Sequence, residues 1–448
     1  MTNHSKREPW RWVLPTVFFL GALLRLIWPA DMEFKYDELF MFDRTQKIGV
    51  TEGWPWLGMT SGAGYRNPGL SIWIFALFAK MFFVKTEIGL VRIVMFLNTA
   101  ALGLMMMVAY RFLPWFYEDS KTAEKDRPTW LWASVLLAVN PLAMLFERKI
   151  WAQSILPLFS LLFLLSWFKR RDRWGAFFWG FLGACLGQIH MSGFFFAGGF
   201  LLWTFFNFDK KKPNENTHWR YWIAGTSLGA LLISPWIYYM LREIFHHLTG
   251  AGATGSLPQK TFTLHFFKFW IEDAIGVENP FYFENPPFGV NHPGSGISFS
   301  LGPFIEAFWG DYYFANFSRW LILATSLLVY LKSLWPLIRS PEKAKEILKP
   351  HSPTSQATLA TLLGMGVVIS AFPIPVFRHY LIVAYPLQWL FLVKLVIKNF
   401  KKHQRVLLAI FFANLVLSVH LLYFLHINGG APGGDYGPSF RVSQTLRR

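Results

Sequence analysis

Two adjacent acids, Asp37 and Glu38, are the residues of this 448-residue chain best suited to chemistry. They follow the first apolar run, within the stretch Glu33-Phe-Lys-Tyr-Asp-Glu-Leu-Phe-Met-Phe-Asp-Arg. Apolar neighbours keep water from a carboxylate and raise its pKa, which suits it to accept a proton from a hydroxyl group as a general base. The alternative is structural: either acid could cap a helix or pair with Lys35 or Arg44.

Cationic side chains follow a later apolar run, in the stretch Glu147-Arg148-Lys149-Ile-Trp-Ala-Gln153-Ser154. Almost no loop separates this run from the next, so these charges must lie close to a membrane surface, where ionisable groups usually have a function or a partner. Arg148 could bind a phosphate through two hydrogen bonds, and Lys149 could add a point charge, with Gln153 nearby in the sequence. The alternative is that both cations extend to anionic lipid headgroups.

Histidine side chains occupy two further positions beside apolar runs. His190, in Gln188-Ile-His190, could donate to a phosphate or a sugar, or could be satisfied by the backbone. The stretch Arg378-His379-Tyr380 places a cation and an imidazole before another run, where they could neutralise an anionic leaving group. The alternative is that Arg378 and Tyr380 anchor the chain at the membrane interface.

The sequence offers no pattern of a protein-built metal site. It contains no His-x-x-His, Asp-x-Asp or zinc-type spacing, and the pair His246-His247 alone is a weak signal. The single cysteine, Cys185, excludes an intrachain disulfide and lies in an apolar run, which favours a packing role. The sequence leaves open whether a divalent cation takes part in the chemistry.

The composition predicts that membrane helices position these residues. Hydrophobic residues make up 53% of the chain, aromatic residues 19% and charged residues only 15%. A water-soluble core cannot bury that much apolar surface, so lipid must cover much of it. The net charge of +17 arises from Lys and Arg clusters between the apolar runs, which favours a membrane-orientation signal over a nucleic-acid-binding face.

Apolar runs that could cross about 30 Å of hydrocarbon, with tilt and short half-helices allowed, predict an all-α polytopic membrane protein of eleven spans. The expected spans lie near residues 12–29, 89–110, 130–146, 153–168, 174–190, 194–207, 221–241, 319–337, 357–374, 380–397 and 405–425.

The basic clusters predict the orientation of the chain. Lys6, Arg7 and Arg11 place the N-terminus on the cytoplasmic side of the membrane. Every later basic cluster then lies on the cytoplasmic side only if the apolar segment from Gly69 to Val84 does not cross the membrane. We therefore expect that segment to be an external interfacial helix.

This topology places three segments of a single domain, residues 1–448, outside the membrane. Residues 30–87 are expected to hold juxtamembrane helices, and residues 242–318 an ordered cap with short helices between spans seven and eight. The third segment, 426–448, is Gly-rich but lacks the strand and the Lys or Ser of a phosphate-binding loop, so it is read as a flexible or capping tail. Function is therefore expected on the external side.

The order of these motifs resembles the GT-C type membrane glycosyltransferases, in particular the glycosyltransferase family 39-like group related to protein O-mannosyltransferases and the lipid A aminoarabinose transferase. The resemblance covers most of the chain. It rests on Leu24-Arg25, Asp37-Glu38, Asn67-Pro68-Gly69-Leu70-Ser-Ile-Trp73 (similar to the family's Pro-Pro-Leu-x-x-Trp), Leu90-Val-Arg92, Asn140-Pro141, Gln188-Ile-His190 and Arg378-His379-Tyr380-Leu-Ile-Val-Ala-Tyr385-Pro386.

The resemblance implies an inverting sugar transfer from a polyprenyl-phosphate carrier to an acceptor hydroxyl at the outer face of a bacterial inner membrane. It implies that Asp37 is the base and Glu38 its supporter. In this hypothesis the donor phosphate lies near Arg148, His190 and Arg378. The acceptor could be a lipid, a glycan or a protein, and neither it nor the sugar follows from the sequence.

Two features bear on this reading. Members of the family often hold a further acid in the second external loop. The corresponding stretch of this chain has Glu147 and Gln153 as the nearest candidates. This difference from the family weakens the transfer of that acid's role to this chain, and it also weakens the assignment of a metal. The rival functions are a lipid-linked saccharide flippase and a glycan ligase. A transporter should carry charges at mid-membrane, whereas only Arg25 and Lys394 lie within apolar runs, both near ends from which they can extend to the surface.

Overall fold

The computed structural model describes residues 8–60, 65–206, 217–248, 262–276, 313–339, 352–372, 376–430 and 436–445. These residues are almost entirely helical, apart from a hairpin of two antiparallel strands, β1 (Leu57–Thr60) and β2 (Arg66–Pro68). The fold class is therefore all-α, as predicted.

The helices of the first half of the chain cover the predicted spans up to residue 207. They are α1 (Glu8–Leu26), the 3-10 turn η1 (Pro29–Asp31), α2 (Tyr36–Lys47), α3 (Leu70–Met81), α4 (Glu87–Met107) continued by the π-helical η2 (Val108–Phe112) and α5 (Leu113–Phe116), α6 (Ser120–Ala138), α7 (Pro141–Phe146), η3 (Gln153–Ile155), α8 (Leu156–Phe168), α9 (Arg173–Ile189) and α10 (Ser192–Phe206).

Helices also occupy the predicted spans of the second half. They are α11 (Trp219–Ala230) with η5 (Leu231–Ile233) and α12 (Ser234–Leu248), α13 (His265–Ile275), α15 (Tyr313–Arg339), α17 (Pro353–Leu359) with η7 (Ala360–Gly366) and α18 (Val367–Ala371), η8 (Arg378–Ala384), α19 (Leu387–Asn399), α20 (His403–Asn428) and α21 (Phe440–Thr445). Most of the predicted cap at 242–318 lies outside the described residues, except for parts of α12 and α15 and for α13.

Four helical segments in the described ranges are long and apolar enough to cross a membrane, and a fifth is obtained if the bent pair η8 and α19 counts as one span. The structure thus supports an all-α membrane protein with four or five such spans, and the count of eleven stays a prediction. The four segments are Glu87–Phe116, Trp219–Glu243, Pro353–Ala371 and His403–Ile427.

Two of the predicted spans are broken by proline. The run at 130–146 splits at Asn140, whose side-chain oxygen accepts the backbone N–H of Ala143 at 2.9 Å and so begins α7, with Pro141 as its first residue. The run at 380–397 bends by 75° between η8 and α19, next to Pro386, which has no N–H to continue a helix.

The segment predicted as an interfacial helix forms α3, which has 12 residues. At 1.5 Å per residue it is about 18 Å long, too short to cross about 30 Å of hydrocarbon. The helices α8 and α10, which cover two predicted spans, are also short, with 13 and 15 residues, so the interfacial position of α3 stays a prediction.

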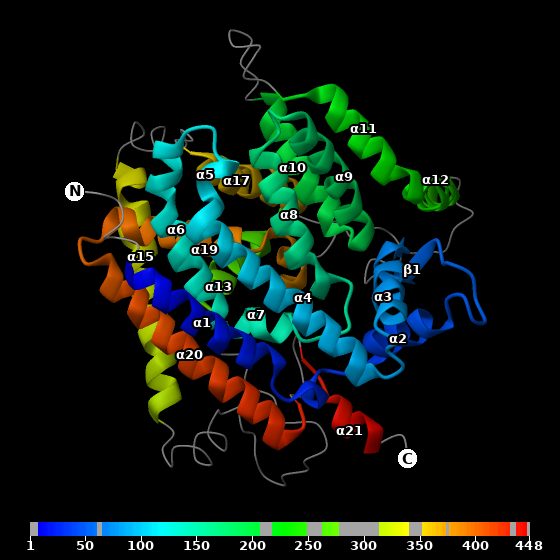
Figure 1. The fold of residues 1–448 in the computed structure, drawn as a ribbon, viewed down its shortest axis with the longest axis horizontal. Coiled ribbons are helices and arrows are strands. Elements are labelled where there is room, and N and C mark those ends of the chain that lie inside the picture. The colour runs from blue at the N-terminus through cyan, green and yellow to red at the C-terminus, as the bar shows by residue number, and fades with distance from the viewer. Residues whose placement is uncertain are drawn as a thin grey trace.

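The N-terminal helix α1 packs on α4, α6 and α20 (Figure 1). The chain leaves α1 through η1 and enters α2, and the C-terminal α21 packs against η1. The loop after α1 and the C-terminal segment therefore meet beside the predicted acids.

Candidate functional site

Glu38 is held by the start of its own helix. It is 1% exposed, and its Oε2 accepts the backbone N–H of Lys35 at 2.8 Å, which satisfies a free donor at the N-terminus of α2. The structural alternative of helix capping therefore holds for Glu38. The alternative of a pair with Arg44 is wrong, because Arg44 bonds to Glu52 at 2.5 Å.

Asp37 is the accessible member of the pair. It is half-buried, whereas Glu38 is enclosed. Burial and the nearby carboxylate of Glu33 raise the pKa of Asp37, while Lys149 and the indole of Trp151 act in the opposite direction. The same two causes raise the pKa of Glu38 to about 8, so Glu38 is mostly protonated at neutral pH.

Lys149 lies at the centre of the site and is fully buried. Its ammonium group forms an ion pair with Glu33, which also bonds to Lys35 at 2.5 Å. Three aromatic rings surround the ammonium group, with centroids at 4.4 Å (Trp151), 5.3 Å (Tyr436) and 5.6 Å (Phe146). Cation–π attraction and exclusion of water both favour this position. We call Lys149 with these three rings the Lys149 cage.

The predicted histidines meet close to Trp151. The ring of His379 lies edge-on to Trp151 at 5.3 Å, and 6.1 Å from the ring of His190. Tyr380 lies 4.8 Å from His379 and 5.3 Å from His190. His379 Nδ1 is buried and makes no hydrogen bond within the described chain, whereas His190 Nδ1 lies 2.8 Å from Ser192 Oγ. A ligand atom could pair with His379 Nδ1.

Gln153 begins η3, close in sequence to Trp151, and is largely buried. The structure thus brings together Lys149, His190, His379 and Tyr380 around Trp151, with Asp37 next to Lys149 and Trp151.

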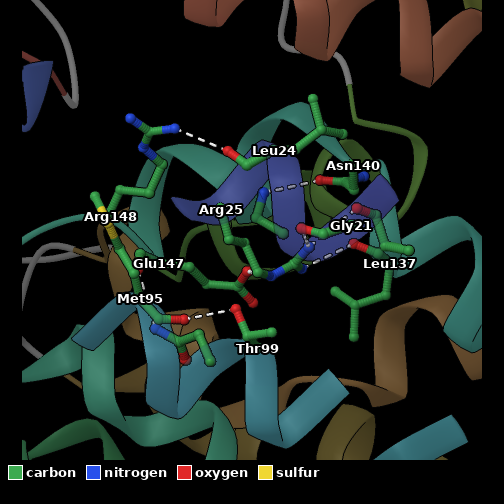
Figure 2. Close-up of polar contacts among 12 residues, drawn as sticks. Gly21, Leu24, Arg25, Met95, Thr99, Leu137, Asn140, Glu147 and Arg148 are labelled. Carbon is green, nitrogen blue, oxygen red and sulfur yellow. Dashed lines mark hydrogen bonds and ion pairs between the residues drawn. The ribbon is translucent and has the colours of Figure 1, made fainter. Parts of the chain in front are cut away.

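Arg148 has internal partners. It is 3% exposed, and its guanidinium group donates to the carbonyls of Leu24 (2.8 Å), Ile27 (2.7 Å) and Trp28 (3.0 Å), at the C-terminal end of α1. Figure 2 shows the bond to Leu24. Free carbonyls at a helix C-terminus attract cations. The alternative of extension to lipid headgroups is wrong, and binding of a phosphate would require these bonds to break.

Arg25 is also buried, so the expectation that it reaches the surface is wrong. Its Nε lies 2.7 Å from a carboxylate oxygen of Glu147, and its terminal nitrogens donate to the carbonyls of Gly21, Leu137 and Ala138 at 3.0–3.1 Å (Figure 2). Burial raises the pKa of Glu147 to about 7 although Arg25 opposes the rise. Glu147 therefore acts as a partner of α1.

Arg378 is neutralised by two acids that sequence reasoning missed. Its guanidinium group lies 2.6 Å from a carboxylate oxygen of Glu272 and 2.8 Å from one of Asp273, both in α13, and Arg378 is 2% exposed. An anionic leaving group would have to compete with these carboxylates. The adjacent His379 has no such constraint on Nδ1.

Sequence reasoning also missed Glu33 and Trp151, although both stand in the stretches that carry the predicted acids and cations. Tyr436 was missed as well, because no local pattern links it to residues near the N-terminus. Cys185 is buried, in agreement with a packing role. Among the described residues, no group of three or more His, Cys, Asp or Glu side chains could hold a metal ion.

A cavity of about 320 Å³ opens between α9, α10 and α11. Its lining is almost entirely apolar, with Trp179, Phe194 and Trp222 among the rings, and Gln188 lies at the same end of α9 as His190. The volume is at the lower end of the usual range for small-molecule sites. The cavity suits a hydrocarbon chain.

No family model and no curated protein matches this chain. The resemblance to membrane glycosyltransferases therefore stays a prediction, and the function must be argued from the site.

Proposed function

We propose that this protein is an inverting glycosyltransferase that moves a sugar from a polyprenyl-phosphate carrier to an acceptor hydroxyl, with Asp37 as general base. The observation that carries the proposal is the convergence of Asp37, Lys149 and His379, from three distant parts of the chain, in one largely dry site. Such a site combines a base with cationic and neutral groups suited to a departing phosphate.

Asp37 fits the role of base better than Glu38. A base must reach the acceptor hydroxyl, and Asp37 is half-buried, whereas Glu38 is enclosed and bonded to the backbone of Lys35. Desolvation raises the pKa of the Asp37 carboxyl, which makes its carboxylate a stronger proton acceptor. Glu38 would serve as a support that fixes the start of α2.

In the proposed reaction the acceptor oxygen attacks the anomeric carbon as its proton passes to Asp37. The new bond forms from the acceptor oxygen to that carbon, and the bond from the carbon to the phosphate oxygen breaks on the opposite face, which inverts the configuration. The electron pair leaves with the polyprenyl phosphate. Lys149 would stabilise the growing charge, and His379 Nδ1, which lacks a hydrogen bond within the described chain, would pair with the donor.

The proposal includes the number of spans, the membrane and the orientation of the chain. Eleven spans in a bacterial inner membrane, a cytoplasmic N-terminus and a periplasmic site would place the acids where a lipid-borne donor is presented. The cavity between α9, α10 and α11 would then hold apolar carrier carbons. Lipid, glycan and protein acceptors all satisfy this arrangement.

The test is sugar transfer by purified protein in nanodiscs with radiolabelled polyprenyl-phosphate sugars and a membrane extract as acceptor source. Asp37→Asn should slow transfer by about 10²- to 10⁴-fold, because the amide cannot accept the proton. The matched control is Asp43→Asn on the same helix, since the side chain of Asp43 is 46% exposed and forms an ion pair with Lys47, one turn further along α2. A mutant Asp37→Asn that transfers sugar at the wild-type rate refutes the assignment.

The second candidate is a lipid-linked saccharide flippase. The observation in its favour is the buried Arg25–Glu147 pair, because charges among membrane helices often mark transport pathways. In the same assay a flippase would bind the lipid-linked donor and move no label to a new product.

A further inference from the structure

The C-terminal segment at residues 436–445 is bound to the loop that carries the acids. The backbone N–H of Phe34 donates to the carbonyl of Pro438 at 2.9 Å, and that of Phe440 donates to the carbonyl of Met32 at 2.8 Å. The hydroxyl of Ser443 donates to the carbonyl of Phe34 at 2.9 Å. These three bonds hold both sides of Glu33, the partner of Lys149.

Aromatic packing adds to these bonds. The ring of Phe440 meets Phe34 edge-on at 5.0 Å, and both side chains are buried. In Figure 1, α21 lies beside the loop between α1 and α2. The segment therefore forms a strap across the start of the site.

Tyr436 connects this strap to the Lys149 cage. It is 2% exposed, its ring centroid lies 5.3 Å from the ammonium group of Lys149, and its hydroxyl donates to the carbonyl of Asp31. The two groups are far apart in sequence, since Tyr436 follows Asp31 by 405 residues. One side chain thus covers Lys149 and fixes the loop that leads to Asp37.

The electrostatics of the site depend on this cover. The attraction between Lys149 and Glu33 is strong where water is excluded, and weakens as the effective dielectric constant rises. Removal of the Tyr436 ring would admit water to the ammonium group. Asp37 would then lose part of the desolvation that raises its pKa.

We propose that residues 436–445 position the acids of the site, and that Tyr436 is the positioning residue that closes the Lys149 cage. The catalytic part of this inference rests on the proposed glycosyl transfer. The structural part, exclusion of water from Lys149, can be measured without any substrate.

The experiment uses full-length protein in nanodiscs and compares Tyr436→Leu, which removes the aromatic wall and the hydroxyl, with Tyr436→Phe, which keeps the wall. Gln444→Ala is the matched control, since Gln444 is exposed on the same segment. Lys149 is treated with an amine-reactive reagent, and its modification is quantified by mass spectrometry. We expect Lys149 to be protected in the wild type, in Tyr436→Phe and in Gln444→Ala, and to react in Tyr436→Leu.

Sugar transfer is then measured in the same samples. Tyr436→Leu should lower kcat by about 10- to 100-fold with little change in KM, because the base is misplaced while donor contacts remain. Its acid limb of activity should move to lower pH, because solvation lowers the pKa of Asp37. Tyr436→Phe should restore most of kcat.

A folded Tyr436→Leu variant with Lys149 still protected and kcat unchanged would overturn the proposal. If this variant does not elute as a folded protein, Ser443→Ala takes its place; no change in Lys149 reactivity and kcat would then overturn it. If the wild type transfers no sugar from any donor, the proposed function fails, while Lys149 reactivity still decides whether Tyr436 closes the cage.

Discussion

The buried ion pair between Arg25 and Glu147 predicts that loss of one partner alone will lower the free energy of unfolding strongly. Substitution of Glu147→Gln keeps the size of the side chain and removes the charge that compensates Arg25. The guanidinium group retains three carbonyl partners but stays positively charged, because Arg does not lose its proton in a protein. Removal of one partner from a buried ion pair costs about 3–5 kcal/mol, so we expect a loss of this size in the free energy of unfolding at a pH well above the pKa of Glu147, which is about 7.

An exposed pair of the same length provides the control. Asp43 and Lys47 lie 2.7 Å apart, as do Arg25 and Glu147, but both side chains are more than 40% exposed. The substitution Asp43→Asn should therefore cost at most about 1 kcal/mol. The two variants make the same acid-to-amide change and differ in burial.

The assay is unfolding by SDS in mixed micelles, followed by tryptophan fluorescence and extrapolated to zero SDS. The double variant Arg25→Gln/Glu147→Gln should be more stable than Glu147→Gln alone, because it contains no uncompensated charge. Equal costs for Glu147→Gln and Asp43→Asn would refute the reasoning, since burial would then not govern the energy of the pair.

Two further predictions concern stability. The pKa of Glu38 is about 8 in the folded protein, against an ordinary value of 4.5, so the folded state binds this proton more tightly than the unfolded state does. The free energy of unfolding should therefore fall as the pH rises between these two values, by up to about 5 kcal/mol. The variant Glu38→Gln should show a smaller fall when unfolding is measured at about pH 5 and at about pH 8.5. Gly198→Ala should stabilise α10 by about 1 kcal/mol, because a methyl group at this position meets open space. Gly180→Ala should destabilise the fold, because its methyl group would lie 2.3 Å from the carbonyl oxygen of Trp222 and 2.6 Å from Thr226 Oγ1. The thermal unfolding temperatures of the two variants should therefore shift in opposite directions.

The sequence predicts the positions of the helices well and their ends less well. Apolar runs between charged clusters identify helices, because a segment long enough to cross lipid must satisfy its backbone hydrogen bonds within itself, and a helix does so. The break at Asn140 had a local signal, since Asn followed by Pro favours the start of a new helix. The bend after Ala384 also stands next to a proline, Pro386, but its direction depends on packing that no local pattern encodes.

The site could be predicted only in part, for a similar reason. The types of Asp37, Lys149 and His379 suggested chemistry, and the structure brings Lys149 close to both of the others. The partners of Arg148 and Arg378 could not be foreseen, because backbone carbonyls and acids far away in the sequence determine them. Guanidinium groups at the ends of apolar runs therefore identify buried positions more reliably than they identify ligands.

The contact between Tyr436 and the first loop also has a consequence for biosynthesis. Glu33 and Asp37 are translated early, whereas the ring that covers Lys149 is added 405 residues after Asp31. The aromatic cover over Lys149 can therefore form only after Tyr436 has been translated and has left the ribosome. A stop codon introduced between α20 and α21 should therefore yield a chain in which the ammonium group of Lys149 is open to water.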